Sequence, residues 1–478
     1  MMRKKGSVTV FLTLILSLLL SLICASIESV RMASARTQIL NGMDIGLYSL
    51  FGQYDKELLT DYDLFALDGS GGGGQLDLAA VCDELEAYMN PVLKQNSQKL
   101  TLCQSGLTGY RLLTDQNGEA FYQQIVGYMQ ETLGSQGIQL LLGRMSERQE
   151  KTAQADQSAN QAQSKGSIDR YDSEMNQASE KSQQAAEEAQ VVPQAPPAKN
   201  PITIMKRIMK RGVLELVLPG GNGLSTKAIE KGTLVSGRGL QQGLEMPDGM
   251  PVENSYTSEV LFQQYLMEHL GSYAEPSSAG LAYQMEYIFG GKDSDEDNLK
   301  AVASKLLFIR EGVNFACLMA DNVKRSEAQA LATAIASGFL VPPAAVIIEA
   351  ALILCWAFAE SVLDVRELFA GGRIPLVKSS ADWQISLGNL PDLMEGLDSM
   401  RRNDEKGMSY KDYLQVLVLT VSKEKKVMRA MDMIENTIRE KGRRNFCMDS
   451  CIVALEAFAD VKANKKKDFQ VIRQYCYE

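Results

Sequence analysis

The sequence is poor in the residues that most often carry chemistry. It has one histidine, His269, and two tryptophans among 478 residues. A single imidazole excludes metal sites built from several histidines and leaves little room for a histidine general base. The eight cysteines do not replace it, because no two pairs of them have the spacing of a zinc site. Phosphate-loop, dinucleotide-binding and nucleophile-elbow motifs are absent as well.

Positive charge is also scarce. The chain has 49 Lys and Arg residues against 59 Asp and Glu residues, a net charge of −10, whereas a nucleic-acid surface needs clustered cations. We therefore predict no nucleic-acid partner, no cofactor or metal, no small-molecule substrate and no enzymatic activity. What the chain does have is apolar residues, 45% of the total, which is enough to bury a core.

The first long apolar run lies near the N-terminus. Residues 8–27 carry no charge, and about 20 residues form a helix as long as a bilayer's hydrocarbon core is thick. Lys and Arg residues precede the run, so the positive-inside bias places the N-terminus in the cytoplasm and the remaining chain outside. A cleaved secretory signal is the alternative, although residues 24–26 form a poor cleavage site. The predicted single-pass anchor thus consists of Arg3, Lys4 and Lys5 for topology and of Val8, Phe11, Leu14, Leu18, Leu22 and Ile27 in the lipid.

The helical pattern continues beyond the apolar run. Within residues 26–51 the apolar side chains fall mostly on one stripe of a helix. This pattern predicts that the membrane helix runs on into an amphipathic stem, which we assign to residues 28–68. The stripe consists of Ile27, Val30, Ile39, Leu40, Met43, Leu47, Tyr48 and Phe51.

Three N-terminal segments carry a family likeness: Lys4-Lys5-Gly6-Ser7-Val8-Thr9-Val10-Phe11, Arg31-Met32-Ala33-Ser34-Ala35-Arg36 and Asn41-Gly42-Met43-Asp44. With the apolar run between them, they resemble pilin-like proteins, above all the minor pseudopilins of tight-adherence (Tad/Flp) pilus systems. The resemblance implies a pilin-like stem, processing after Gly6 and incorporation into a fibre. One position departs from it, because Phe11 stands where such pilins carry a glutamate.

Segments farther along the chain extend the resemblance to an uncharacterised family of membrane-anchored proteins from Gram-positive anaerobes, often encoded near tight-adherence pilus genes. This likeness implies a location and a neighbourhood but no activity. The segments that carry it are Tyr54-Asp55-Lys56-Glu57-Leu58-Leu59, Leu64-Phe65-Ala66-Leu67-Asp68, Glu286-Tyr287-Ile288-Phe289-Gly290-Gly291-Lys292, Asp382-Trp383-Gln384-Ile385-Ser386-Leu387 and Tyr410-Lys411-Asp412-Tyr413-Leu414.

We predict an α+β fold that is predominantly helical. Residues 1–27 form the cytoplasmic head and anchor, and a glycine-rich joint after the stem leads to a small mixed lobe, residues 75–145. The strand-like residues 99–113 are expected to join a C-terminal hairpin-like segment, residues 441–478, in one small discontinuous sheet. The first arm of that hairpin, residues 451–461, fits a strand or a helix equally well.

The rest of the chain divides into a polar segment and a more apolar domain. Residues 146–201 are rich in Gln, Ala, Ser and Glu and end in a Pro-rich linker; with good helix formers but scarcely any large apolar residue, they predict a partly helical, solvated stalk or linker. Residues 202–440 predict a mainly helical domain. Within it, the apolar run 330–359 could cross a membrane, but Pro342-Pro343 breaks it and a carboxylate such as Glu349 costs about 3 kcal/mol at mid-bilayer. We favour a buried helical hairpin with Glu349 paired or at a helix–helix boundary.

Two questions stay open at this level. Cys82 with Cys103, or Cys451 with Cys476, would form disulfides outside the cell, and free buried thiols are the alternative. For function we expect a membrane-anchored extracytoplasmic structural or assembly component, whose partners are the membrane and pilus or secretion-system proteins. The alternatives are an extracytoplasmic cell-wall-acting hydrolase and a two-span scaffold or signalling protein, which requires that residues 330–359 cross the membrane.

Overall fold

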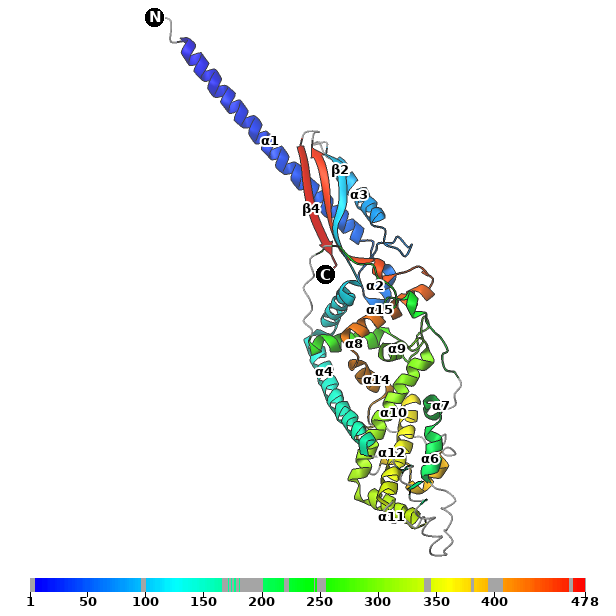
Figure 1. Ribbon diagram of the computed structural model, residues 1–478. Helices are drawn as coiled ribbons and strands as arrows, with labels where there is room; N and C mark the ends of the chain where they lie inside the picture. Colours follow the sequence, from blue (N-terminus) through cyan, green and yellow to red (C-terminus); the bar gives the residue numbers. More distant parts are fainter. Residues whose placement is uncertain are drawn as a thin grey trace. The chain divides into compact units, whose positions relative to one another are not determined.

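The protein is α+β and predominantly helical, with one small sheet, as predicted (Figure 1). The computed structural model describes residues 5–95, 100–165, 171, 173, 176, 177, 180, 201–218, 223–244, 246, 255–338, 345–379, 382–393, 407–463 and 467–477. Arg3, Lys4, Pro342-Pro343 and the Pro-rich residues 191–200 lie outside this part. The chain divides into two compact units, which are residues 1–128, 233–253 and 438–478 (unit 1) and residues 129–232 and 254–437 (unit 2).

Unit 1 begins with one long helix, α1 (Lys5–Phe51). No proline interrupts its 47 residues, so the backbone hydrogen bonds run unbroken from the apolar run into the stem. After α1 the chain turns into α2 (Lys56–Tyr62), whose N-cap Asp55 accepts hydrogen bonds from two backbone amides, and which ends at Asp63 in the left-handed region. The anchor and stem predicted from sequence are therefore one continuous helix as far as Phe51, and residues 52–68 of the predicted stem leave that helix.

The sheet of unit 1 is assembled from distant parts of the chain. β2 (Leu100–Leu112) pairs antiparallel with β3 (Cys451–Ala463), and β3 pairs antiparallel with β4 (Lys467–Cys476) and with the short β1 (Leu67–Asp68). This arrangement confirms the predicted discontinuous sheet. It also settles the open alternative, because residues 451–461 are a strand.

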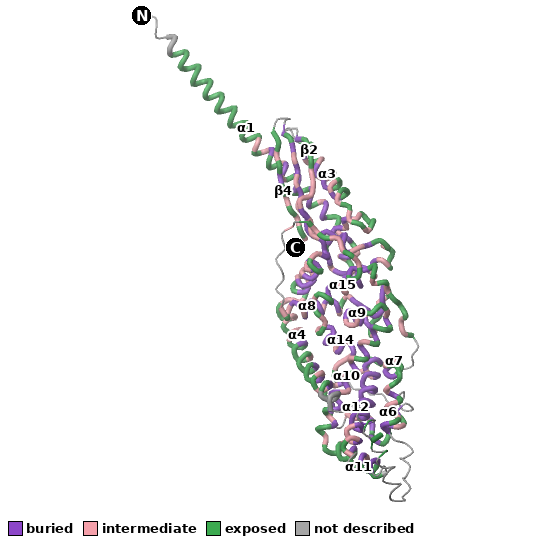
Figure 2. Tube along the Cα trace, in the orientation of Figure 1, coloured by how far each residue is buried: buried purple, intermediate pink, exposed green. Residues whose placement is uncertain are grey.

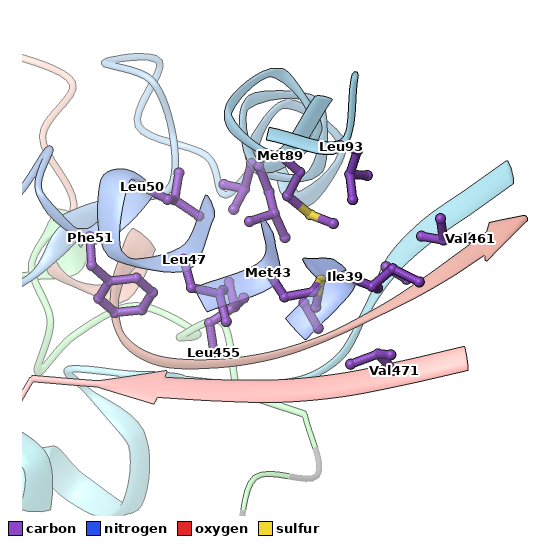
Figure 3. Close-up of a cluster of buried hydrophobic side chains, with 14 of the residues drawn as sticks. Ile39, Met43, Leu47, Leu50, Phe51, Met89, Leu93, Leu455, Val461 and Val471 are labelled. Carbon is purple, nitrogen blue, oxygen red and sulfur yellow. The ribbon is translucent and has the colours of Figure 1, made fainter. Parts of the chain in front are cut away.

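One face of this sheet packs against α1 and α3 (Leu78–Lys94) (Figure 3). Alternate residues of β3 point to the helices, as a period of two requires. Because Leu455, Ala457, Ala459 and Val461 are all fully buried, β3 lies at the centre of the unit 1 core.

Unit 2 is helical, and its core lies between α10 (Asp295–Ala320) and α12 (Ala345–Phe369). α10 begins at the N-cap Ser294. The acidic cluster at its start is structural, since buried Asp295 accepts hydrogen bonds from the backbone amides of Ala282 and Tyr283. Also in unit 2 are α6 (Pro201–Met209), α7 (Val213–Val217), α8 (Tyr256–His269), α9 (Gln284–Gly290), α11 (Asn322–Gly338), the 3-10 helix η4 (Leu387–Asp392) and α14 (Tyr410–Leu419).

Two further helices belong to both units. α4 (Asp115–Lys165) begins in unit 1 and continues in unit 2 from residue 129, and α15 (Lys423–Glu440) leads back into unit 1 at residue 438. The 3-10 turns η1 (Lys231–Thr233) and η5 (Met448–Ser450) complete the described elements. The predicted lobe of residues 75–145 is therefore not a separate unit, because residues 75–128 belong to unit 1 and residues 129–145, within α4, belong to unit 2.

The predicted solvated stalk differs from the structure over residues 146–165. These residues continue α4, and Thr152, Ala155 and Ala159 are buried. The reason is that the residues in contact on α4 and α10 are both small. A Cβ added at Gly312 of α10 would lie 2.1 Å from the backbone of Ala159 in α4. Close backbone approach replaces the large apolar side chains that the sequence argument required. Most of the predicted stalk beyond residue 165 lies outside the described residues.

The apolar run 330–359 is divided between α11 and α12, and the most apolar part of α12 is 78% buried. Glu349 lies 3.9 Å from Arg325 across these two helices. The structure therefore has the core packing and the paired carboxylate that the sequence favoured for this run.

Candidate functional site

The first half of α1 is the most unusual surface of the described chain (Figure 2). Its most apolar 18-residue window has none of its residues buried, and it is long and apolar enough to cross a membrane. The side chains predicted to face lipid are between 49% and 67% exposed: Val8, Phe11, Leu14, Leu18, Leu22 and Ile27. A contiguous apolar surface of this size marks a membrane or protein contact.

Three hydroxyl groups within this segment donate hydrogen bonds to the helix backbone. Thr13 donates to the carbonyl of Thr9 at 3.0 Å, Ser21 to Leu18 at 3.0 Å and Ser26 to Leu22 at 2.9 Å. Hydrogen bonds of this kind to the preceding turn remove the need for water around the side chain. These three positions are thus compatible with a hydrocarbon environment.

The second half of α1 is the opposite, because one stripe of it is fully buried. Ala35, Ile39, Met43 and Leu47 recur every four residues and insert between α3 and the sheet (Figure 3). Glycine permits the close approach of α3, since a Cβ at Gly46 would lie 2.6 Å from Met89. The second half of α1 is therefore held by packing contacts that its exposed first half lacks.

Aromatic contacts fix the end of the stem. Phe51 lies 4.8 Å, centroid to centroid, from both Tyr475 and Tyr477, and the Tyr477 hydroxyl donates to the Phe51 carbonyl at 2.6 Å. Burial raises the pKa of Tyr477, so the hydroxyl stays a donor. Arg473 of β4 adds an exposed ion pair with Asp44 at 3.1 Å.

A second apolar face runs along the stem away from the core. Val30 and Tyr48 are both 69% exposed and Ile45 is 48% exposed. At 3.6 residues per turn, Val30 and Tyr48 are about five whole turns apart and so lie on one face. That face is opposite the buried stripe, so the prediction that placed Val30 and Tyr48 on one stripe with Ile39 and Met43 is wrong for these two residues, whose side chains are open to a partner.

The polar cleft of unit 1 gives no catalytic arrangement. It has a volume of about 610 Å³ and is lined by the end of β2, the start of α4 and residues 240–244. Its carboxylate Asp115 accepts hydrogen bonds from the backbone amides of Leu112 at 2.7 Å and Gly243 at 2.9 Å. Asp115 therefore anchors a loop to the start of a helix.

Unit 2 contains a buried acid, Glu286 of α9. One of its oxygens accepts hydrogen bonds from the Tyr410 hydroxyl at 2.6 Å and from the Tyr273 amide at 2.8 Å. Burial raises the pKa of Glu286 to about 7. The carboxyl group is thus poised to change its charge near neutral pH, and it lies behind the aromatic residues Tyr273 and Tyr410 that line a cleft of unit 2.

Four ionised side chains meet in the core of unit 2. Arg310 of α10 lies 2.8 Å from Asp364, and Lys378 lies 2.5 Å from Asp364 and 2.6 Å from Glu360. All four side chains are 0–1% exposed. Burial alone would raise the pKa of Asp364, but the charges of Arg310 and Lys378 hold it below its ordinary value.

This buried cluster of four charged side chains was not predicted from the sequence. The signal was present as two acids, Glu360 and Asp364, four residues apart within an apolar helix. Residues at that spacing share one face, and buried carboxylates require cations. The partners Arg310 and Lys378 lie 50 and 18 residues from Glu360 in sequence, so no local pattern could identify them.

The remaining candidates have structural roles in the described part of the chain. All eight cysteines are free thiols, so neither Cys82 with Cys103 nor Cys451 with Cys476 is bonded. Cys476 lies opposite Ala454 in the sheet register, three residues from Cys451. The ring of His269 stacks on Tyr265 at 4.0 Å, and among the described residues no three His, Cys, Asp or Glu side chains are grouped to hold a metal ion.

Comparison with known proteins finds one family that matches this chain. The model of a Family of unknown function (DUF5702) matches residues 193–463, more than half of the chain. The matched region includes most of unit 2 together with β3, and it excludes α1 and β2. No curated protein and no solved structure matches the chain.

Proposed function

The chain belongs to this family of unknown function, and we propose that it is a membrane-anchored extracytoplasmic structural or assembly component of a tight-adherence pilus-like or secretion apparatus, acting through protein–protein contacts. The observation that carries the proposal is the division of α1 into a fully exposed apolar span and a packed stem. A lipid bilayer supplies the missing environment for the span, because its thickness equals the length of the exposed run.

The proposed topology places the N-terminus in the cytoplasm and both units outside. Arg3, Lys4 and Lys5 support this orientation through the positive-inside bias. The sheet supports a single crossing: β2 precedes α12 in the chain, β3 follows it, and the two strands are hydrogen-bonded to each other. One crossing by α12 would put these strands on opposite sides of the membrane, which argues against the two-span alternative.

Contacts through the stem provide the proposed mode of action. The exposed face begins just beyond the span at Val30 and continues along the stem to Ile45 and Tyr48, where the stems of neighbouring anchored proteins would meet. Helices that share a membrane orientation can pack side by side through such faces. This is the type of contact that the resemblance to minor pseudopilins implies.

Protease treatment of intact cells, after removal of the wall, tests the topology. One epitope tag is inserted between Gly71 and Gly72, where nothing lies within 4 Å of an added Cβ, and a second follows Glu478. In the protease-treated cells we expect both tags to be lost. In untreated cells we expect the protein in the membrane fraction. Survival of the C-terminal tag, or release of untreated protein into the soluble fraction, would refute the proposal.

A further inference from the structure

Lys378 occupies an unusual position for a lysine. Its ammonium group is fully buried and lies within 2.6 Å of two carboxylates, Glu360 and Asp364, which are also buried. The indole of Trp383 lies 5.6 Å from the ammonium nitrogen and is itself in contact with Trp356, which is buried. An amine and a carboxyl carbon are thus held together in a site that excludes water.

The charge balance of the cluster favours loss of one ion pair. Arg310, Lys378, Asp364 and Glu360 carry two positive and two negative charges in a region without solvent. Each buried ion carries a desolvation penalty. Conversion of the Lys378–Glu360 pair into a neutral amide would remove two of these charges and leave the Arg310–Asp364 pair intact.

We propose that Lys378 and Glu360 form an intramolecular isopeptide bond that links α12 to the segment after it. The bond joins Lys378 Nζ to Glu360 Cδ, and the C–O bond to one carboxylate oxygen breaks. Two of the three ammonium protons leave with that oxygen as water, and the third stays on the amide nitrogen. Atoms and charge balance without an oxidant, a reductant or another reactant, since an ammonium and a carboxylate give an amide and water.

The neighbouring groups fit the steps of this reaction. The hydrogen bond between Lys378 Nζ and Glu360 Oε1 provides the path for the first proton, which leaves a neutral amine beside a carboxylic acid. The other oxygen, Oε2, accepts a hydrogen bond from the backbone amide of Ile385 at 3.1 Å, and the Gln384 amide is shared between Oε2 at 3.3 Å and Oε1 at 3.2 Å. Two backbone donors of this kind stabilise the negative oxygen of a tetrahedral intermediate.

Asp364 is placed to act as the base. Its Oδ1 lies 2.5 Å from Lys378 Nζ, while its Oδ2 is held by Arg310 and by the amide of Asn314. Once the nitrogen has added to Glu360 it becomes a strong acid, so a carboxylate of low pKa can still take its proton and pass it to the departing oxygen. After reaction, the amide N–H would donate to the same Asp364 oxygen.

Mass spectrometry of the full-length protein tests the bond directly. The protein is extracted from membranes in detergent, denatured, reduced and digested with trypsin. We expect a branched peptide that joins the Glu360 and Lys378 segments, lighter than their sum by one water molecule, with no cleavage after Lys378. Recovery of only the separate linear peptides, with cleavage after Lys378, would overturn the proposal.

Two variants separate the reaction from the fold. Lys378→Arg retains the positive charge but lacks the amine, so the branched peptide is lost and the intact mass is that of the uncrosslinked chain. Asp364→Asn should slow bond formation by roughly 100-fold or more if Asp364 is the base. An Asp364→Asn protein that forms the bond at the wild-type rate would remove Asp364 from the reaction, and the wild-type digest decides the bond itself even if a variant fails to fold.

Discussion

Two helices of this protein are long and apolar enough to cross a membrane, yet they have opposite surroundings. The first, within α1, is not buried at all, and the second, α12, is 78% buried over its apolar window. The difference lies in their polar residues. Residues 8–27 carry no charge, whereas α12 contains Glu360 and Asp364, and both bind cations inside unit 2. Hydropathy alone therefore does not separate a span from a core helix; the partners of the charged residues do.

The largest effect should follow from placing charged residues within the apolar run of α1, as α12 has within its own. Leu14→Arg with Leu18→Arg places two charges at mid-helix, and each costs about 2.5–3.5 kcal/mol in a bilayer. We expect the double variant to leave the membrane fraction, as measured by carbonate extraction and immunoblotting. Leu14→Ala with Leu18→Ala is the matched control and should stay. Retention of the arginine variant would show that residues 8–27 do not span.

The second effect tests the charges of α12. Arg310→Met removes a buried cation that pairs with Asp364 in the core, which should lower the free energy of unfolding by roughly 3–5 kcal/mol. Both tryptophans, Trp356 and Trp383, belong to unit 2, so their fluorescence during urea unfolding reports on this unit. Arg325→Met is the control, because its pair with Glu349 at 3.9 Å is part-exposed and should contribute less than about 1 kcal/mol. Equal effects of the two variants would contradict the comparison.

The two helices also show how far the sequence could be interpreted. The apolar run of residues 8–27, most of the stem stripe and the buried character of α12 follow from local patterns of charge and period and could be predicted, whereas Val30 and Tyr48 were assigned to the wrong face of the stem. A sheet of β2 with the C-terminal hairpin was also predicted, but the pattern of β3 fitted a helix equally well. Tight packing of Ala159 on Gly312 and the contact of Lys378 with Glu360 could not be predicted. Both depend on which distant segments meet, and small residues or isolated charges leave no periodic signal.

A third, pH-dependent effect concerns Glu286 in unit 2. Its pKa is about 7 in the fold against 4.5 for an ordinary glutamate, so the folded state binds the proton more tightly than the unfolded state. The contribution of Glu286 to stability is therefore fully present below pH 4.5 and is lost as the pH rises toward 7, by about 3 kcal/mol at 1.36 kcal/mol per pKa unit.

Glu286→Gln should remove this share of the pH dependence in urea unfolding measured from pH 4.5 to 8. Glu311, whose pKa burial also raises to about 7, should supply the remainder in the same direction. A profile for Glu286→Gln identical to that of the wild type would show that Glu286 ionises normally.

The smallest effect on stability is expected on the exposed face of the stem, and it separates folding from assembly. Tyr48→Ala with Val30→Ala removes side chains that are 69% exposed, so the sheet amides should keep their hydrogen-exchange protection to within about 0.5 kcal/mol. Met43→Ala, on the buried stripe of the same helix, should lower that protection by roughly 2–5 kcal/mol. If the exposed face is the contact surface, only the Tyr48/Val30 variant will combine a normal fold with loss of chemical cross-linking to neighbouring proteins in the membrane. Unchanged cross-linking in that variant would assign the contacts to another surface, while the anchor and the stem would stand.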